Sequence, residues 1–416
     1  MTRWRDVRMR GFAARADVEE VERFLVSMTP EPLAAEACAL GDCAGRVLAA
    51  DVHSPVDVPG FARSAMDGYA VRGEDTFGAG DYSPLELRVV GRALPGHPFP
   101  GHVVRGQAVR IMTGAALPDG ADAVAMSEIC EERDDGIVRV REGVAPRKHV
   151  GAIGEDMRAG DRVLGRGRRL RPQDIGALSS IGCAQVLVVR RPRVQLVITG
   201  DELLPAGVRP EGPRIPDSNS PMLAALIARD GGEVLPYEIL PDRAERIRAA
   251  LETHGADVVL VSGGSSVGEE DHAPPLVAEL GTLDYHGVSM RPSSPAGVGR
   301  VAGRLVFLLP GNPVSCLCAY EFFAGPVLRA LGGRPRAWPH RRLRAPLARK
   351  ISSAVGRTDY VRVALESGRV VPIATSGASI LSSTVRAAGC VIVPRELEGV
   401  PEGCEVEVLL YDEDPT

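Results

Sequence analysis

The sequence has very little lysine and few aromatic residues. Of its 49 basic residues only Lys148 and Lys350 are lysines, and aromatic side chains make up 4% of the 416 residues. Proteins that bind nucleic acids need a basic surface and often stack bases on aromatic rings. The formal net charge of −5 and the scarcity of aromatic rings therefore argue against a nucleic-acid-binding protein.

Long apolar runs and metal-binding cysteine motifs are also missing. No apolar run approaches the roughly 20 residues that span a bilayer, and residues 1–15 contain five arginines but no apolar stretch, so they do not resemble a secretory signal. The eight cysteines include no C-x-x-C pair, and Cys316 and Cys318 lie in an apolar helical run that is typical of a core. These features predict a cytoplasmic protein with no membrane segment, no structural zinc and reduced thiols.

The length and the turn-forming residues indicate several domains built from short elements. A chain of 416 residues is too long for one ordinary domain and predicts two to four. Its 47 glycines and 33 prolines favour many loops over long helical bundles.

The first half of the chain has the pattern of a discontinuous domain interrupted by an insertion. Apolar spacing predicts a helix over residues 17–28 and a second over 32–46, and another helical segment follows Arg171. Between them lie short β-type runs such as LELRVVG and AVRIMTG. We expect a first domain of residues 17–54 and 154–189, with a mostly β insertion over residues 55–153.

The next 150 residues alternate strands with helices. Strands are predicted over 194–199, 233–240, 257–264 and 304–311, with helices between and after them. The first of these helices is expected to have Ser220 as N-cap, Pro221 as its first residue and Gly231 near its C-cap. Such alternation predicts an α/β domain, residues 190–336, with a mostly parallel sheet covered by helices on both faces. Residues 337–414 are expected to form a small C-terminal β domain.

Three of the predicted strands end in unusual loops, and ligands bind at the carboxyl ends of strands in open α/β sheets. The first loop is Thr199-Gly200-Asp201-Glu202, the second Ser262 to Gly268 followed by three acidic residues, and the third Pro310-Gly311-Asn312-Pro313. The second loop offers backbone N–H groups to an anion, and the third offers those of a helix that Asn312 caps and Pro313 begins. Carboxylates beside a phosphate site usually imply a bridging Mg²⁺.

Each of these segments also has a purely structural interpretation. Glycine-rich turns often serve only to pack a helix on a strand, and Asp201 and Glu202 can cap the next element. Asp217-Ser218-Asn219 is a typical turn, and Asp67-Gly68 a typical hairpin. Their combination is what favours a functional site.

Together these motifs resemble the molybdopterin molybdotransferase family, which includes MoeA and the gephyrin E domain. The motifs that carry the resemblance are SAMDGYA (64–70), IMTG (111–114), GED (154–156), TGDEL (199–203), DSN (217–219), SGGSSVG (262–268) and PGNPVS (310–315). They occur in the family's order and span nearly the whole chain.

The resemblance implies a transferase that takes adenylylated molybdopterin and molybdate, and releases AMP and the molybdenum cofactor. It implies Mg²⁺ and an elongated homodimer of four-domain subunits, in which the β insertion of one subunit faces the α/β domain of the other. The molybdopterin adenylyltransferase is a further expected partner.

The resemblance also implies roles for individual residues. Catalytic roles fall to Asp67, Glu202, Asp242 and Asp271, of which the last three are also expected to hold the metal. Substrate binding falls to Thr113, Asp156, Asp217, Asn219, Ser262, Gly263, Gly264, Ser265, Gly268, Pro310, Gly311, Asn312 and Pro313. Molybdate binding falls to Arg291, Ser294, Arg357 (or Arg362) and Ser379.

The chain departs from the family where a Lys-Pro-Gly-Lys-Pro stretch is usual, because it has Arg291-Pro292-Ser293-Ser294-Pro295. It also lacks the arginine that usually precedes the GED motif. Two alternatives therefore stay open beside the molybdenum insertase: a paralogue that acts on another phosphorylated or adenylylated ligand, and a dimeric binding or scaffold protein.

Overall fold

The computed structural model describes residues 12, 15–265, 268, 271–374 and 377–411. Its contacts divide the chain into two compact units. One unit contains Met1–Glu36, Gly45–Val47 and Val188–Thr416, and the other contains Ala37–Ala44 and Leu48–Leu187. The finer division into four domains stays a prediction.

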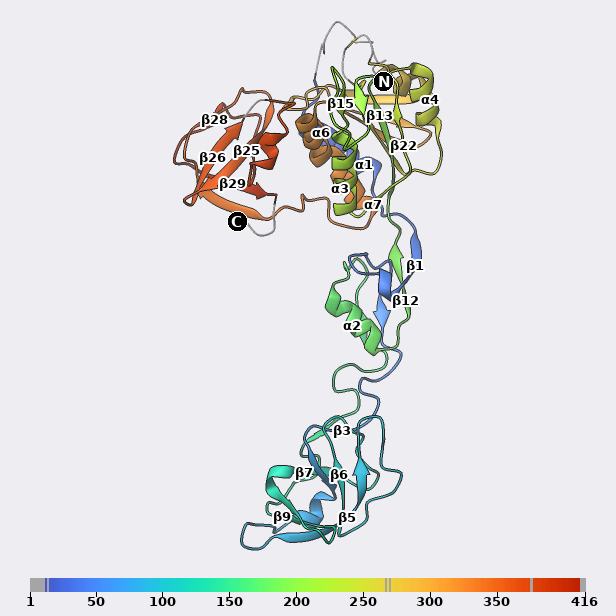
Figure 1. The fold of residues 1–416 in the computed structure, drawn as a ribbon, viewed down its shortest axis with the longest axis vertical. Coiled ribbons are helices and arrows are strands. Elements are labelled where there is room, and N and C mark those ends of the chain that lie inside the picture. The colour runs from blue at the N-terminus through green and yellow to red at the C-terminus, as the bar shows by residue number, and fades with distance from the viewer. Residues whose placement is uncertain (1–11, 13–14, 266–267, 269–270, 375–376, 412–416) are drawn as a thin grey trace. The chain divides into compact units, whose positions relative to one another are not determined.

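The unit that contains Val188–Thr416 is built around a seven-stranded mixed sheet (Figure 1). Strands β16, β13, β18 and β22 run parallel, and the hairpin strands β21 and β19 continue the sheet in antiparallel pairing. The strands are β13 (Arg193–Thr199), β16 (Glu233–Val234), β17 (Ile239–Leu240), β18 (Val258–Ser262), β19 (Gly281–His286), β21 (Gly297–Val301) and β22 (Arg304–Leu309).

Helices cover both faces of this sheet, as the apolar strands predict. Leu196 and Ile198 pack in one core with helices α1, α3, α6 and α7, whereas Val197 packs in a second core with α4 and α5. Figure 1 shows α3 and α6 on one side of β13 and β22, and α4 on the other. The helices are α1 (Val18–Met28), α3 (Asn219–Arg229), α4 (Ala244–Glu252), α5 (Ala273–Leu280), α6 (Pro313–Ala319) and α7 (Gly325–Leu331). The predicted three-layer α/β architecture is confirmed.

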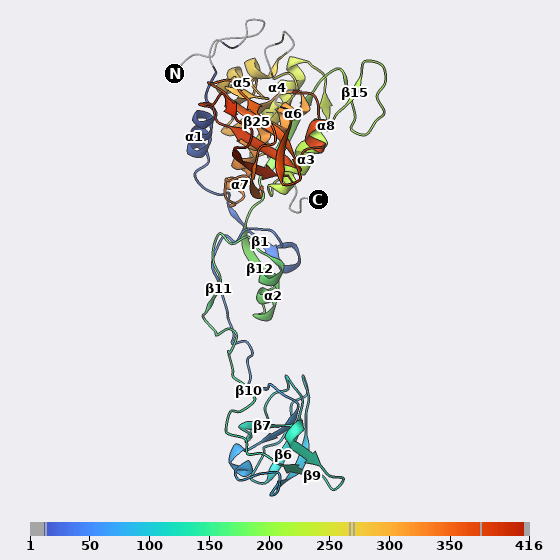
Figure 2. The ribbon, with the colours of Figure 1, turned by 90° about the vertical axis from the view of Figure 1, so that its left-hand side faces the viewer.

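A second sheet in the same unit is formed almost entirely by the C-terminal residues. Its order is β20-β25-β27-β29-β23, with β26 paired to β25. The strands are β20 (Met290–Arg291), β23 (Arg342–Pro346), β25 (Thr358–Glu366), β26 (Arg369–Ala374), β27 (Gly389–Val393) and β29 (Glu405–Leu410). Smaller elements are the pair β24 (Ile351–Ser352) and β28 (Gly399–Val400), helix α8 (Ser382–Val385), and the pair β14 (Leu203–Leu204) and β15 (Ile215–Pro216), whose loop projects from the unit (Figure 2).

The other unit contains a six-stranded, mostly antiparallel sheet with apolar side chains on both faces, so the predicted β-rich insertion is confirmed. Its order is β7-β4-β6-β5-β9-β8, formed by β4 (Gly68–Val71), β5 (Leu85–Ala93), β6 (Gln107–Ile111), β7 (Ala123–Met126), β8 (Cys130–Glu132) and β9 (Ile137–Val140). The pairs β2 (Val52–His53) with β11 (Arg162–Leu164) and β3 (Arg63–Ser64) with β10 (Val150–Gly151), and helix α2 (Pro172–Ser180), complete it.

Several local predictions are wrong in an instructive way. The helix predicted over residues 32–46 is instead strand β1 (Ala35–Ala39), which pairs with β12 (Gln185–Val189), and a short 3₁₀ turn (Leu40–Asp42). Pairing with a distant strand overrides the helix propensity of this alanine-rich segment. The strand predicted over 233–240 is split into β16 and β17, and its register on β13 shifts by one residue, because Pro236 cannot donate to a ladder.

Two predictions about helices also need correction. Helix α3 begins at Asn219 and not at Pro221, because the carboxylate of Asp217 accepts the free N–H groups of Asn219 and Ser220. The continuous helix Pro313–Leu331 has 19 residues and a mean hydropathy of 1.3, which is long and apolar enough to span a membrane, contrary to the expectation from the sequence. It is 78% buried inside the protein and contributes to the core of the α/β layers.

Candidate active site

Three loops begin side by side at the carboxyl edge of the parallel strands. In the sheet register Ile198 lies opposite Ser262, and Ser262 lies opposite Leu309. The loops after Thr199, Ser262 and Leu309 therefore start at one edge, as the sequence predicts for an α/β ligand site.

The Asn219 side chain joins these loops. Its Nδ2 group donates to Ser262 Oγ at 2.9 Å and to the carbonyl of Gly311 at 2.7 Å. Asn219 is only 7% exposed, and its backbone N–H is held by Asp217 at 2.9 Å. The DSN turn therefore also has a role in the site, because the Asn219 side chain connects the SGG loop to the PGNP turn.

The SGG loop depends on glycine where it passes the end of β13. Gly263 has a φ of 94°, and a Cβ atom at this position would lie 2.1 Å from the carbonyl oxygen of Thr199. Further along the loop, Ser265 Oγ donates to the carbonyl of Leu309 at 2.7 Å, and the carbonyl of Gly264 accepts from Ala273 N at 3.2 Å. Ser266, Val267, Glu269 and Glu270 lie outside the described residues.

The PGNP turn leads directly into helix α6. Pro313 is the first helical residue, and Asn312 stands at the N-cap, where its backbone carbonyl accepts from Cys316 N at 2.9 Å. Its side chain makes no capping hydrogen bond, so the side-chain cap expected from the sequence is not formed. Pro310 and Gly311 precede it in the turn that Asn219 contacts.

Two buried polar atoms at this edge have no hydrogen-bond partner among the described residues. They are Thr199 Oγ1 and Asn219 Oδ1. Buried polar groups are almost always paired in native proteins, and exceptions concentrate where a ligand or water binds. These atoms are therefore available to a polar ligand or a water molecule at the strand ends.

Aspartates follow the first and the second of these strands. The backbone N–H of Asp201 donates to Asp242 Oδ2 at 3.2 Å, and that of Asp242 donates to Asp201 Oδ1 at 3.3 Å. Asp271 accepts from the N–H of Gly268, which fixes the end of the SGG loop. Glu202 is exposed beside Asp201.

The donor set only partly suits the expected Mg²⁺. The buried Oδ1 of Asp242 has no hydrogen-bond partner among the described residues, and a carboxylate oxygen of this kind suits a hard cation. However, in the part of the chain that the structure describes, which omits Glu269 and Glu270, no three acidic, histidine or cysteine side chains gather as a metal site. Glu202, Asp242 and Asp271 therefore do not form a ready-made triad.

His286 is a neighbour of the SGG loop that sequence reasoning missed. Its Nε2 lies 3.1 Å from the carbonyl oxygen of Ser265, and its buried Nδ1 has no partner among the described residues. Burial lowers the pKa of His286, although the hydrogen bond to Ser265 and the charge of Asp271 oppose the shift. No local motif marks this histidine, because β19 brings it to the loop from a part of the chain without a recognised pattern.

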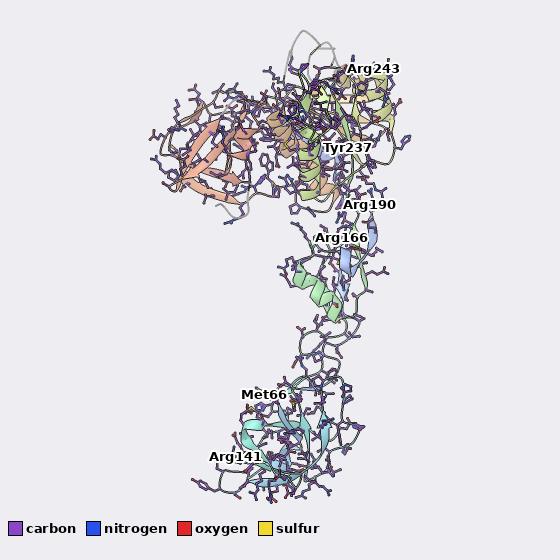
Figure 3. All side chains as sticks on the ribbon, viewed as in Figure 1. Met66, Arg141, Arg166, Arg190, Tyr237 and Arg243 are labelled. Carbon is purple, nitrogen blue, oxygen red and sulfur yellow. The ribbon has the colours of Figure 1, made fainter. Side chains whose placement is uncertain are left out.

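The β-rich unit contains a separate pair of predicted site residues, Asp67 and Thr113. Thr113 donates to Asp67 Oδ1 twice, from its backbone N–H at 2.7 Å and from its hydroxyl at 2.8 Å. These hydrogen bonds lower the pKa of Asp67. The structure thus brings together two predicted site residues 46 positions apart in sequence. Met66, beside them in sequence, is 44% exposed and labelled in Figure 3. Asp156 is exposed, and its backbone N–H donates to the carbonyl of Val58 at 3.1 Å.

The expected molybdate residues are placed around the second sheet. Arg291 and Arg357 both form ion pairs with Asp359, Arg291 through Nη2 and Arg357 through Nε at 3.0 Å. Ser294 has a buried Oγ with no partner among the described residues, and Ser379 is exposed. Arg362, the alternative to Arg357, is fully buried and donates to Ser383 Oγ at 3.1 Å.

Three protein-family models match successive parts of the chain. Residues 195–330, which carry the strand-end loops, match a probable molybdopterin-binding domain. Residues 16–182 match the MoeA N-terminal region, domains I and II, and residues 344–411 match the MoeA C-terminal region, domain IV. These matches define the class of the protein, which is a MoeA-type chain with a probable molybdopterin-binding domain.

Relatives and solved structures agree over nearly the full length. The molybdopterin molybdenumtransferase of Haemophilus influenzae is 33% identical over 94% of this chain and 97% of its own. Molybdopterin molybdenumtransferase 2 of Mycobacterium tuberculosis is 35% identical over 88% of this chain and 92% of its own. The crystal structure of the molybdopterin biosynthesis MoeA protein from Pyrococcus horikosii has a TM-score of 0.82 at 33% identity, covering 96% of this chain and all of that one. The chain belongs to the MoeA family of molybdopterin molybdenumtransferases.

Proposed function

We propose that this protein inserts molybdenum from molybdate into adenylylated molybdopterin, and releases AMP and the molybdenum cofactor. Family membership supports the broader role, a transferase in molybdenum cofactor biosynthesis. The observation that carries the finer proposal is the Asn219 side chain, which ties the SGG loop to the PGNP turn at the strand edge.

The strand-end loops suit an anionic, adenylylated ligand. Gly263 and Gly264 both have positive φ, so their backbone approaches without a side chain, and N–H groups in such a turn can bind phosphate oxygens. Thr199 Oγ1 and Asn219 Oδ1 supply polar atoms that need a partner. We propose that the phosphate and pterin parts of the substrate bind here.

The carboxylates proposed to hold Mg²⁺ are Glu202, Asp242 and Asp271, which do not gather as a metal site among the described residues. When bound, Mg²⁺ would neutralise charge on the bridging phosphate oxygens of the adenylylated substrate. The chain's own contribution is to hold Asp242 in place through its paired contact with Asp201, and Asp271 through Gly268.

Arg291 and Arg357 are the proposed ligands of molybdate as substrate. Guanidinium groups bind oxyanions through charge-assisted hydrogen bonds, each worth about 1.5–3 kcal/mol. About a third of each side chain is exposed, at 29% and 33%, so N–H groups remain outside their ion pairs. Ser294 and Ser379 are the neutral members of the proposed set.

We also propose the setting in which the protein works. It would act in the cytoplasm as a homodimer in which Asp67 contributes to catalysis and Thr113 to substrate binding, and would receive its substrate from the molybdopterin adenylyltransferase. The proposed domains are residues 17–54 with 154–189, 55–153, 190–336 and 337–414; residues 412–414 lie outside the described part of the chain.

The test is AMP release from adenylylated molybdopterin by the purified protein with Mg²⁺, measured at increasing molybdate. We expect AMP release to rise with molybdate and to saturate. Asp242→Asn and Asp271→Asn should each lower turnover by about 100-fold or more, since each removes a carboxylate charge beside the phosphates. Substrate binding without molybdate-dependent release would contradict the proposal and favour a paralogue that uses another adenylylated ligand.

A further inference from the structure

Asp359 is a buried carboxylate to which the proposed function assigns no role. It is 0% exposed and lies in β25, in the second sheet. Three side chains converge on it: Arg291 Nη2 and Ser353 Oγ donate to Oδ2, the latter at 2.9 Å, and Arg357 Nε forms an ion pair with Oδ1 at 3.0 Å but no hydrogen bond. A buried charge is costly unless it is paired in this way.

The register of the sheet explains how the cluster forms. Strand β20 pairs parallel with β25, and Arg291 lies opposite Asp359 in the ladder. The Thr358 N–H donates to the carbonyl of Ser289 at 2.9 Å, which fixes this register from the other end of β20. Arg357 lies two residues before Asp359, at the bend that leads into β25. Arg291 and Arg357 therefore reach the same carboxylate from two segments 66 residues apart.

The cluster keeps a net positive charge at its accessible side. Two guanidiniums share one carboxylate, so one positive charge remains uncompensated by Asp359. Burial lowers the pKa of Arg362, and the charge of Arg291 is a smaller cause in the same direction. An oxyanion that approached this cluster would meet arginines whose orientation the protein has already fixed.

We propose that Asp359 is a positioning residue for molybdate binding, which holds Arg291 and Arg357 in the orientation that receives the oxyanion. This inference rests on the proposed function, because it assigns those arginines to molybdate. Long arginine side chains lose much rotamer freedom when they bind a ligand. A buried carboxylate that fixes them beforehand reduces that loss.

The direction of the change in molybdate affinity distinguishes positioning by Asp359 from Coulomb attraction alone. Asp359→Asn keeps the shape of the side chain but removes a negative charge, so Coulomb attraction alone predicts tighter molybdate binding. Positioning predicts weaker binding, because the arginines lose the partner that orients them. We expect the half-saturating molybdate concentration for AMP release to rise by about tenfold, while the KM for adenylylated molybdopterin changes by less than about twofold.

Asp174→Asn is the matched control. Asp174 is a 4% exposed aspartate in the other unit, where Arg168 and Arg171 bind it at 2.9 and 3.2 Å. The same chemical change there should leave the molybdate dependence unaltered. Isothermal titration of each folded variant with molybdate alone should reproduce the order found in turnover.

Ser353→Ala is a milder variant that tests the same point if Asp359→Asn fails to fold. It removes one hydrogen bond to Oδ2 and should raise half-saturating molybdate by about threefold. Unchanged or tighter molybdate binding in the folded variants would overturn the inference. A wild-type protein that binds no molybdate would overturn the proposed function as well, whereas normal wild-type turnover with an unaltered Asp359→Asn would overturn this inference alone.

Discussion

The strand-end loops and the arginine cluster are the two regions proposed to bind anions, and they are built by different means. In the loops, neutral groups hold the structure: the Asn219 amide, the Ser265 hydroxyl and the close approach of Gly263 to β13. In the cluster, a buried Asp359 holds two arginines. The loops therefore depend on shape and on hydrogen bonds from neutral side chains, whereas the cluster depends on one buried charge.

The largest effect is expected where the backbone of Gly263 passes close to β13. In Gly263→Ala the new Cβ atom would lie 2.1 Å from the carbonyl oxygen of Thr199, so the loop or β13 must move. We expect the free energy of unfolding to fall by about 4 kcal/mol or more, with turnover lowered by more than about 100-fold. Urea unfolding and AMP release measure the two effects.

Gly303→Ala is the control for backbone strain alone. Gly303 also has a positive φ, of 79°, but nothing lies within 4 Å of an added Cβ. This variant should lose only about 1 kcal/mol and keep its turnover. Equal losses at both glycines would contradict the claim that close approach, and not φ, constrains Gly263.

The next largest effect is expected from the Asn219 amide. Asn219→Ala leaves the buried Ser262 hydroxyl without its donor and frees the carbonyl of Gly311. The free energy of unfolding should fall by about 3 kcal/mol. Asn312→Ala, in the adjoining turn, removes a side chain that makes no capping hydrogen bond and should cost less than about 1 kcal/mol. If the two losses were equal, the Asn219 bridge would not be what holds the loops.

A smaller effect should appear at Asp67 in the β-rich unit. Thr113 lowers the pKa of Asp67 through its backbone and hydroxyl hydrogen bonds. Thr113→Val keeps the first and removes the second, so the pKa of Asp67 should rise part of the way toward its ordinary value. Carboxyl-carbon NMR titration measures it. Thr253→Val is the control, because the Thr253 hydroxyl lies in the other unit and donates to the carbonyl of Ala249 at 3.1 Å. An unshifted pKa would show that the backbone N–H alone determines it.

The sequence predicted the loops better than the cluster, and the reason is physical. Glycines, prolines and an Asx turn at strand ends have local conformational causes, so the carboxyl-edge site, α1 and the three-layer sheet could be predicted. Asp359 lies in an unremarkable strand, and its contact with Arg291 depends on the register of β20 with β25. His286 likewise reaches the SGG loop only through tertiary packing. Strand β1 could not be predicted from local sequence, because its partner strand β12 lies about 150 residues away.

The most direct test of this account is to measure both Michaelis constants in two variants. Asn219→Ser shortens the side chain that joins the loops, and should raise the KM for adenylylated molybdopterin by about tenfold with little change for molybdate. Asp359→Asn should raise the KM for molybdate by about tenfold with little change in the KM for adenylylated molybdopterin. Such a crossed pattern would establish two separate anion sites with different supports. If both variants raised the same constant, or both constants together, the division of the substrates between the two regions would be wrong.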